Sequence, residues 1–197
     1  MKNTIRDAFR IMSLIYLLMV SQSLFSEELM GKDSVKKSIK CQDKYKKYIE
    51  NTTWIVPPPT LLAYEYLNGT SVPVTDQTVW VINKFDKGYF FGYSYTSINA
   101  VPSTQTTLVG SITPCGDVYI TFFPVSGNGL SIDIVNGIGK FTKSDSKYYF
   151  VMQMNSAQNN LQGLSHWSYM IGVRPNDYFY KHLPGENMSV PEFISQF

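Results

Sequence analysis

The sequence predicts an all-β protein, an antiparallel up-and-down meander that closes into a barrel of about eight strands. Short runs rich in Tyr, Phe, Val, Ile and Thr alternate with turn residues from residue 52 onward. The gaps between these runs are too short for the crossover helices, about a dozen residues long, that connect parallel strands. Consecutive antiparallel strands leave open edges unless the sheet closes on itself, and this favours a barrel over an open sandwich.

Residues 1–26 have the pattern of a signal peptide. Three basic residues precede an apolar run at 11–20, and small and polar residues follow it. The uncharged stretch 11–26 has 16 residues, whereas roughly 20 are needed to span a bilayer. We therefore expect cleavage after Ser26, with Ser23 as the alternative, and a secreted or periplasmic protein without a stable membrane anchor.

A short lysine-rich helix is predicted between the signal peptide and the barrel, within residues 27–50. Asp33 or Ser34 is the expected N-cap of this helix, which ends near residue 50. Its lysine-rich face is either solvated or in contact with an anionic membrane surface or an acidic partner. The opposite face is a loose apolar stripe made by Val35, Ile39, Tyr45 and Ile49.

The charge of the expected mature chain argues against a nucleic-acid-binding protein. Without residues 1–26 the chain has 14 basic and 14 acidic side chains, and seven of the basic ones lie between Lys32 and Lys47. The remaining body, 48–197, carries seven basic and ten acidic residues. No concentrated positive face is expected on such a body.

The β-barrel domain with its C-terminal tail is predicted at 51–197, since three consecutive prolines at 57–59 exclude a continuing helix. Hairpin turns are expected at 86–88, 114–117 and 143–146, where each joins two strand-like runs. The predicted strands lie at 52–56, 61–67, 77–84, 88–98, 105–113, 117–123, 130–135, 147–154 and 163–173.

This layout of export signal, short helix, meander and C-terminal segment resembles the calycins, the group of β-barrels that includes lipocalins and avidins. The resemblance is one of architecture and covers roughly residues 52–173. It implies a barrel whose interior either is filled by side chains or holds one small ligand.

Several predicted strands carry aromatic residues on both faces. The alternating series that begins at Tyr89 is aromatic throughout, and its opposite face also includes Phe90. This excess indicates an aromatic-lined cavity, an oligomer interface on the barrel wall or a covering helix, although aromatic residues also simply suit strands. The candidate ligand-binding residues, drawn from either face, are Trp80, Phe91, Tyr93, Phe150, Met152, His166 and Trp167.

Residues typical of catalysis are few in this chain. No zinc-type His or Cys motif, phosphate-binding loop or nucleophile elbow is present, so no metal and no cofactor is expected. The glycines at 127–129 and 137–139 are predicted to serve turns or bulges. His166, in a strand between apolar neighbours, is the weak candidate for chemistry, with Glu65 as the acid expected to share its interior. His182 is expected in a loop.

Two further features concern the ends of the predicted domain. Cys41 and Cys115 either form a disulfide bond, as export would permit, or leave Cys115 as an exposed thiol at a hairpin tip. Ser189 and Glu192 have the spacing of a helix capping box, so a short C-terminal helix is expected. The apolar residues of that segment, Phe193, Ile194 and Phe197, are predicted either to plug one end of the barrel or to dock a partner.

These observations favour an exported, noncatalytic β-barrel that binds a small apolar or aromatic molecule. The alternative is a secreted interaction protein, a homo-oligomer or a partner-binding factor, whose aromatic wall contacts another protein. A third hypothesis is an enzyme on the same barrel that uses His166 with Glu65 or a tyrosine as acid and base.

Overall fold

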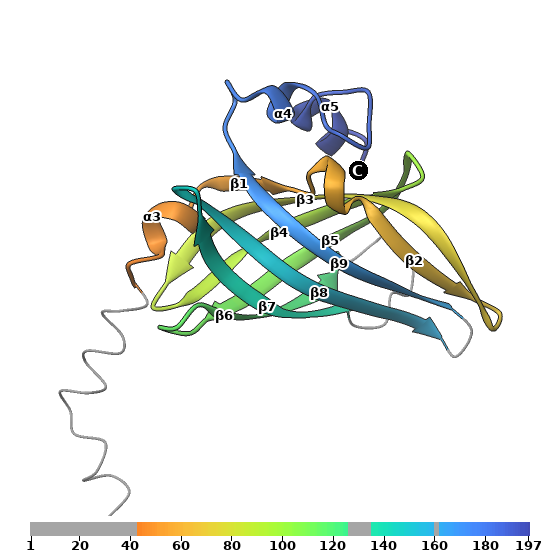
Figure 1. Cartoon of the computed structure of the whole chain (residues 1–197), viewed down its shortest axis with the longest axis horizontal. Coiled ribbons are helices and arrows are strands. Elements are labelled where there is room, and N and C mark those ends of the chain that lie inside the picture. Colours follow the sequence, from red (N-terminus) through yellow and green to blue (C-terminus); the bar gives the residue numbers. More distant parts are fainter. Residues whose placement is uncertain (1–42, 126–134, 160–161) are drawn as a thin grey trace, which may run out of the picture. The chain divides into compact units, whose positions relative to one another are not determined.

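The computed structural model describes residues 43–125, 135–159 and 162–197, which form a closed antiparallel β-barrel with a few short helices (Figure 1). The predicted fold class is therefore confirmed. Among these residues no helix is long and apolar enough to cross a membrane. The elements in chain order are α3 (Lys46–Ile49), β1 (Thr52–Ile55), the 3-10 helix η1 (Pro58–Thr60), β2 (Leu62–Leu67), β3 (Thr70–Asp86), β4 (Tyr89–Ile98), β5 (Val101–Ile112), β6 (Asp117–Pro124), β7 (Val135–Ser144), β8 (Lys147–Asn159), β9 (Gln162–Val173), α4 (Tyr178–Lys181) and α5 (Val190–Ile194).

The barrel has eight positions around its circumference because β1 and β2 share one of them. From β2 to β9 each strand pairs with the next along the chain, as expected for a meander. Both β1 and β2 lie between β3 and β9, β1 beside one half of these long strands and β2 beside the other. The prolines at 57–59 and η1 separate the two short strands, since proline has no N–H to donate to a ladder.

Two-residue turns connect most of the hairpins. Lys87 and Gly88 have φ values of 48° and 86°, and Asp145 and Ser146 have 46° and 67°, the left-handed pair that a tight hairpin turn requires. The predicted turns at 86–88, 114–117 and 143–146 are thus confirmed. Similar turns at 68–69 and 99–100, where both residues again have positive φ, were not predicted.

Strand β7 corrects one prediction. Gly137 and Gly139 were expected in a turn or bulge, yet both lie within this strand. A Cβ atom on Gly139 would lie 1.9 Å from the carbonyl oxygen of Val151 on β8, so glycine is required there by the close approach of two backbones. The expected strand at 130–135 has only its last residue in β7, and residues 130–134, like the glycines at 127–129, lie outside the described residues.

One half of the barrel interior is filled by aromatic side chains. Phe150 lies at the centre of this core, with ring centroids 4.7 Å from Trp54, 5.6 Å from Trp80 and 5.7 Å from Phe90. These four side chains are at most 1% exposed. Their burial supplies much of the hydrophobic stabilisation of the fold.

The C-terminal segment covers the outer wall of the barrel, which corrects the expectation that it plugs one end. Val79 and Tyr95 point outward, in the opposite phase to the inward Trp80 and Ser94, and they pack in one buried cluster with Phe193 of α5. Figure 1 shows α4 and α5 lying against the side of the barrel. The predicted capping box is confirmed, with Ser189 and Glu192 bonded reciprocally.

The N-terminal helix is shorter than predicted within the part described, since α3 begins at Lys46. Of the predicted apolar stripe, Tyr45 and Ile49 are buried in the core, whereas Val35 and Ile39, like the expected signal peptide at 1–26, lie outside the described residues. Tyr45 donates a hydrogen bond of 3.2 Å to the carbonyl oxygen of Pro114 and so ties this segment to the β5–β6 turn. Cys115 in that turn is an exposed free thiol, and Cys41 lies outside the described residues.

Candidate functional site

The inward side chains of the strands change from apolar to polar along the barrel axis. On β4, Phe90 and Gly92 are followed by Ser94 and Thr96, and on β3 the inward series runs back from Ile82 and Trp80 to Thr78 and Asp76. On β9, Met170 gives way to Ser168 and His166. The change occurs within one inward position in these neighbouring strands, because the register places Trp80 opposite Ser94 and Thr78 opposite Thr96. One end of the barrel therefore has a polar interior.

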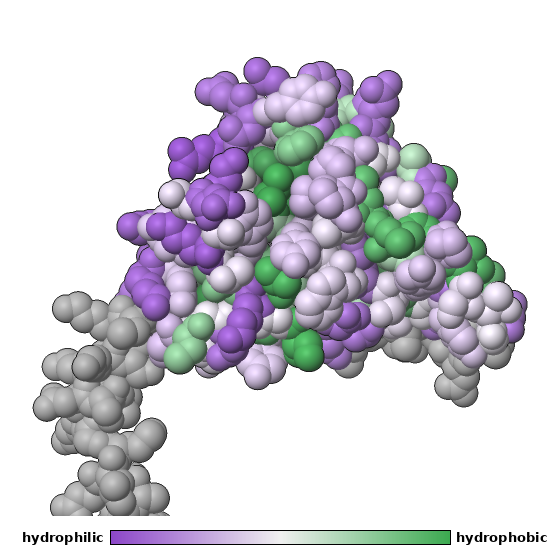
Figure 2. All heavy atoms as spheres, viewed as in Figure 1, coloured by the Kyte–Doolittle hydropathy of each residue, from purple (hydrophilic) through white to green (hydrophobic). Residues whose placement is uncertain are grey.

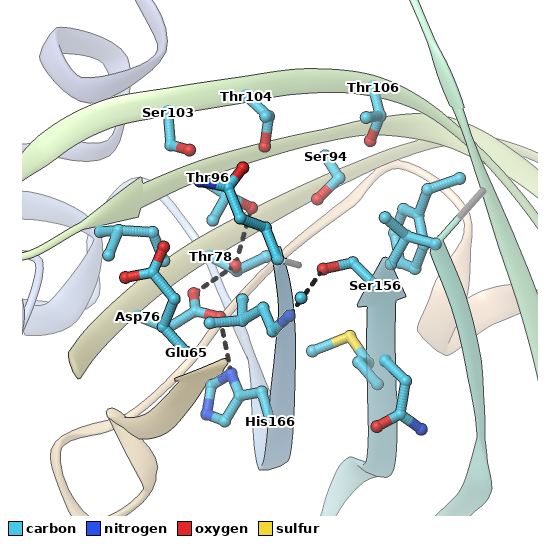
Figure 3. Close-up of a pocket in the computed structure, with 18 of the residues that line it drawn as sticks. Glu65, Asp76, Thr78, Ser94, Thr96, Ser103, Thr104, Thr106, Ser156 and His166 are labelled. Carbon is cyan, nitrogen blue, oxygen red and sulfur yellow. Dashed lines mark hydrogen bonds and ion pairs between the residues drawn. The ribbon is translucent and has the colours of Figure 1, made fainter. Parts of the chain in front are cut away.

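This polar end contains a cavity of about 130 Å³. Its apolar lining includes Trp80, Phe122 and Met154, and Glu65, Asp76 and His166 add three ionisable groups. Figure 3 shows the polar side chains converging on one space from several strands. Seven hydroxyl-bearing residues also line it, namely Thr78, Ser94, Thr96, Ser103, Thr104, Thr106 and Ser156.

The hydroxyl groups form ordered rows across β3, β4 and β5. Thr78 is paired in register with Thr96, which is paired with Thr104. The hydroxyl oxygens of Thr78 and Thr96 lie 2.9 Å apart, within hydrogen-bond distance. The Thr78 hydroxyl also donates a hydrogen bond of 2.7 Å to Asp76 Oδ1. In the next row Ser94 is paired with Thr106.

Ser94 and Thr106 are buried but lack partners among the described residues. Their side chains are only 4% and 5% exposed, and Figure 3 shows both hydroxyls directed into the cavity. The hydrogen bonds within the described part of the chain include none from either hydroxyl. Buried hydroxyls normally find a hydrogen-bond partner, so this pair is available to a molecule in the cavity.

His166 and Asp76 form a buried pair at the edge of the cavity. His166 Nδ1 lies 2.9 Å from Asp76 Oδ2, and His166 Nε2 lies 2.6 Å from the carbonyl oxygen of Thr60. The two side chains are 1% and 3% exposed. Because both ring nitrogens face acceptors, both donate, and this requires the protonated, positively charged imidazolium.

The surroundings of His166 favour this charged form. Burial lowers the pKa of His166, but the hydrogen bond and charge of Asp76 and the carbonyl oxygen of Thr60 outweigh burial, so the pKa lies above its usual value. The folded protein therefore holds an imidazolium–carboxylate pair in its interior.

The segment between β1 and β2 contacts both members of this pair. The ladder between β3 and β9 is interrupted between Ile55 of β1 and Leu62 of β2, and Asp76 on β3 and His166 on β9 lie beside this interruption. The carbonyl oxygen of Thr60 in η1 faces His166 Nε2. The carbonyl oxygen of Leu61 accepts a hydrogen bond of 2.8 Å from the backbone N–H of Asp76. The pair is thus tied to the segment that separates β1 from β2.

The structure separates the predicted site residues into three groups. Trp80 and His166 line the cavity, as does Glu65. The remaining predicted pocket residues lie elsewhere: Phe150 and Met152 are fully buried in the packed core, and Phe91, Tyr93 and Trp167 are on the outer wall, 37%, 40% and 55% exposed.

The partner of His166 is Asp76, which the sequence analysis missed, and not Glu65. Asp76, Thr78 and Trp80 alternate in the sequence and so share one face of a strand. The predicted strand began at residue 77 and therefore excluded the acid. The rows of inward hydroxyls were not predicted, because the expected pocket residues were chosen mainly for their aromatic side chains.

Among the described residues, no three His, Cys, Asp or Glu side chains are placed to hold a metal ion. Comparison of the chain with protein-family models, with curated proteins and with solved structures finds no match.

Proposed function

We propose that this protein is an exported β-barrel that binds one small molecule, without catalysis, in the polar end of its interior. The observation that carries the proposal is the pair of buried hydroxyls, Ser94 and Thr106, which face a cavity without partners among the described residues. A ligand that bonds them would recover hydrogen bonds that the folded chain leaves unmade. The barrel architecture also supports the calycin-like mode of binding that the sequence suggests.

The lining revises the expected chemistry of the ligand. The cavity joins an apolar surface, which includes Trp80 and Phe122, to walls of hydroxyl and carboxyl groups. Its volume of about 130 Å³ is similar to that of an engineered cavity of about 150 Å³ that holds benzene. We therefore infer a ligand with one small ring or short apolar part and at least one polar group, in place of a wholly apolar molecule.

The geometry of His166 favours binding over catalysis. A general base needs a free nitrogen within reach of the proton that it removes. Both nitrogens of His166 are engaged, by Asp76 and by the Thr60 carbonyl oxygen. Glu65 does not contact His166 through any described hydrogen bond, so the acid–base pair proposed in the third hypothesis lacks this geometric support.

The experiment compares two threonine variants of β5 that differ only in the direction of the side chain. Thr106 points inward to the cavity, whereas its neighbour Thr107 is on the opposite face. A panel of monocyclic alcohols, amines and carboxylates is screened by native mass spectrometry and by calorimetry. We expect Thr106→Val to weaken binding by about two- to tenfold, the value of one hydrogen bond, and Thr107→Val to leave it unchanged. Equal affinities in both variants for every ligand found would contradict the proposed site.

Exposed aromatic residues on the outer wall support a second candidate function, the contact of another protein. Tyr119 and Tyr89 are 58% and 57% exposed, and Trp167 is 55% exposed. Figure 2 shows the most hydrophobic side chains of the visible face in separate groups, with residues of intermediate hydropathy between them. Light scattering of the purified protein tests this candidate: a dimer that Tyr119→Ser or Trp167→Ser converts to a monomer would support it.

A further inference from the structure

We propose that the cavity selects cations, and specifically a small molecule that joins an ammonium group to a single ring or short apolar chain. This inference rests on the proposed binding function and names the chemical class of the ligand. It follows from the charges, the free hydrogen-bonding groups and the aromatic surface of the same cavity.

The charge of the lining is negative. Glu65 and Asp76 contribute two carboxylates and His166 contributes one imidazolium, while no Lys or Arg is among the described residues that line the space. The positive charge of His166 offsets the negative charge of Asp76, because His166 Nδ1 lies 2.9 Å from Asp76 Oδ2. Glu65 remains uncompensated, because it forms no ion pair or side-chain hydrogen bond with the residues that the structure describes.

The position of Glu65 suits contact with a ligand inside the barrel. Glu65 lies on β2 opposite Leu164 of β9, which is in turn opposite Ser156 of β8. Figure 3 shows its side chain beside Asp76, on the cavity side of the strand. A cation in the cavity would therefore meet one free carboxylate in surroundings where water screens the attraction less than at an open surface.

The neutral groups of the lining accept hydrogen bonds from such a cation. An ammonium group has three N–H donors and no acceptor. Ser94 and Thr106 offer hydroxyl oxygens that no other described residue uses. A carboxylate ligand, by contrast, would face two acidic side chains, and the one positive group, His166, already donates both of its protons.

The aromatic surface suits the rest of the ligand. The rings of Trp80 and Phe122 lie 5.8 Å apart, tilted by 48°, and both line the cavity. Such rings contact a flat apolar group through their faces, and they attract a nearby cation through the same faces. An aromatic ammonium ion thus matches the negative charge, the hydroxyl oxygens and the aromatic rings of the lining.

The test uses three probes of nearly the same size, benzylamine, benzyl alcohol and sodium benzoate, which are cationic, neutral and anionic at neutral pH. Their affinities are measured by calorimetry in low salt with the purified protein. We expect benzylamine to bind about tenfold more tightly than benzyl alcohol, the value of one charged hydrogen bond, and benzoate to bind least. Glu65→Gln should abolish the preference for benzylamine over benzyl alcohol.

A matched control separates this effect from a general change in charge. Asp86 is exposed in the turn at the apolar end of β3, and Asp86→Asn should keep the preference. Thermal unfolding of each variant establishes that it is folded. Tighter or equal binding of benzyl alcohol or benzoate would overturn the inference of cation selection while keeping the proposed binding function. If none of the probes binds, the inference fails, and the comparison of Thr106→Val with Thr107→Val then decides on the binding function itself.

Discussion

Replacement of His166 by leucine should destabilise the protein strongly at neutral pH. His166→Leu removes both hydrogen bonds of the imidazolium and leaves the Asp76 carboxylate, 3% exposed, without its counter-charge. Loss of one member of a buried ion pair costs about 3–5 kcal/mol. For a domain of this size that loss corresponds to a fall in Tm of roughly 6–20 °C. Urea unfolding followed by tryptophan fluorescence measures the change in the free energy of unfolding.

A second substitution distinguishes the lost charge pair from lost packing. In the double variant Asp76→Asn with His166→Leu, no buried charge remains, and the residue at 76 still offers an oxygen to the Thr78 hydroxyl. We expect the double variant to be more stable than His166→Leu alone. A loss below about 1 kcal/mol in the single variant, the typical value of one neutral hydrogen bond, would refute the assignment of a buried charged pair.

The same pair gives the wild-type protein a defined dependence of stability on pH. The pKa of His166 is raised in the folded protein, whereas the unfolded chain has a pKa of about 6.5. The folded state therefore binds more protons between these two values, so the stabilisation is complete below about pH 6.5 and is lost as the pH rises through the folded pKa. Urea midpoints from pH 5.5 to 9 should fall with pH in the wild type and in His182→Gln, and this slope should be absent in His166→Leu. A wild-type slope of the opposite sign would contradict the charged form.

Three further predictions test the fold and one tests export. Gly139→Ala should cost about 3 kcal/mol or more in urea unfolding, because its Cβ meets a backbone oxygen at 1.9 Å, whereas Gly172→Ala, with nearest contacts at 3.4 Å, should cost far less. Phe193→Ala should lower the free energy of unfolding by about 3–5 kcal/mol through the loss of the fully buried ring that fastens α5 to the barrel wall. Trp167→Ala should change stability by less than about 0.5 kcal/mol and should not alter benzylamine affinity, because the side chain is 55% exposed on the outer wall. The intact mass of protein recovered outside the cytoplasm should correspond to a chain that begins at residue 27, and a mass that includes residues 1–26 would contradict the signal-peptide prediction.

Local sequence patterns were sufficient to predict most of the strands and most of the turns. Alternation and turn chemistry act over a few residues, and the structure places β4 and β6 within a residue or two of the predicted bounds. The strand β7 was mostly missed because Gly139 is typical of a turn in isolation. Glycine is required at position 139 because the carbonyl oxygen of Val151 on β8 lies where a Cβ atom would be. Only the register of the folded sheet brings these two residues together.

The faces of the strands were harder to predict than their positions. Phe90 and Phe91 are adjacent aromatic residues, yet one is fully buried in the core and the other is 37% exposed on the wall. Their order does not show which of them points inward, since each face of β4 carries an aromatic residue and the longer aromatic series is the outward one. In the same way Asp76 and His166 are separated by 90 positions, and no local pattern joins them.

The division of the interior into an apolar and a polar half supports the proposed ligand site at the polar end. On β5 the inward series includes Leu108 and Ile112, which are buried in the aromatic half, so this strand fills the barrel with apolar groups where packing is needed. Two residues before Leu108 it carries Thr106, opposite Ser94 on β4. A valine at either position would remove a hydroxyl that opens into the cavity and makes no bond to a described residue. A molecule in the cavity would give these hydroxyls the hydrogen-bond partners that the described residues do not supply, which is the role proposed for the polar end.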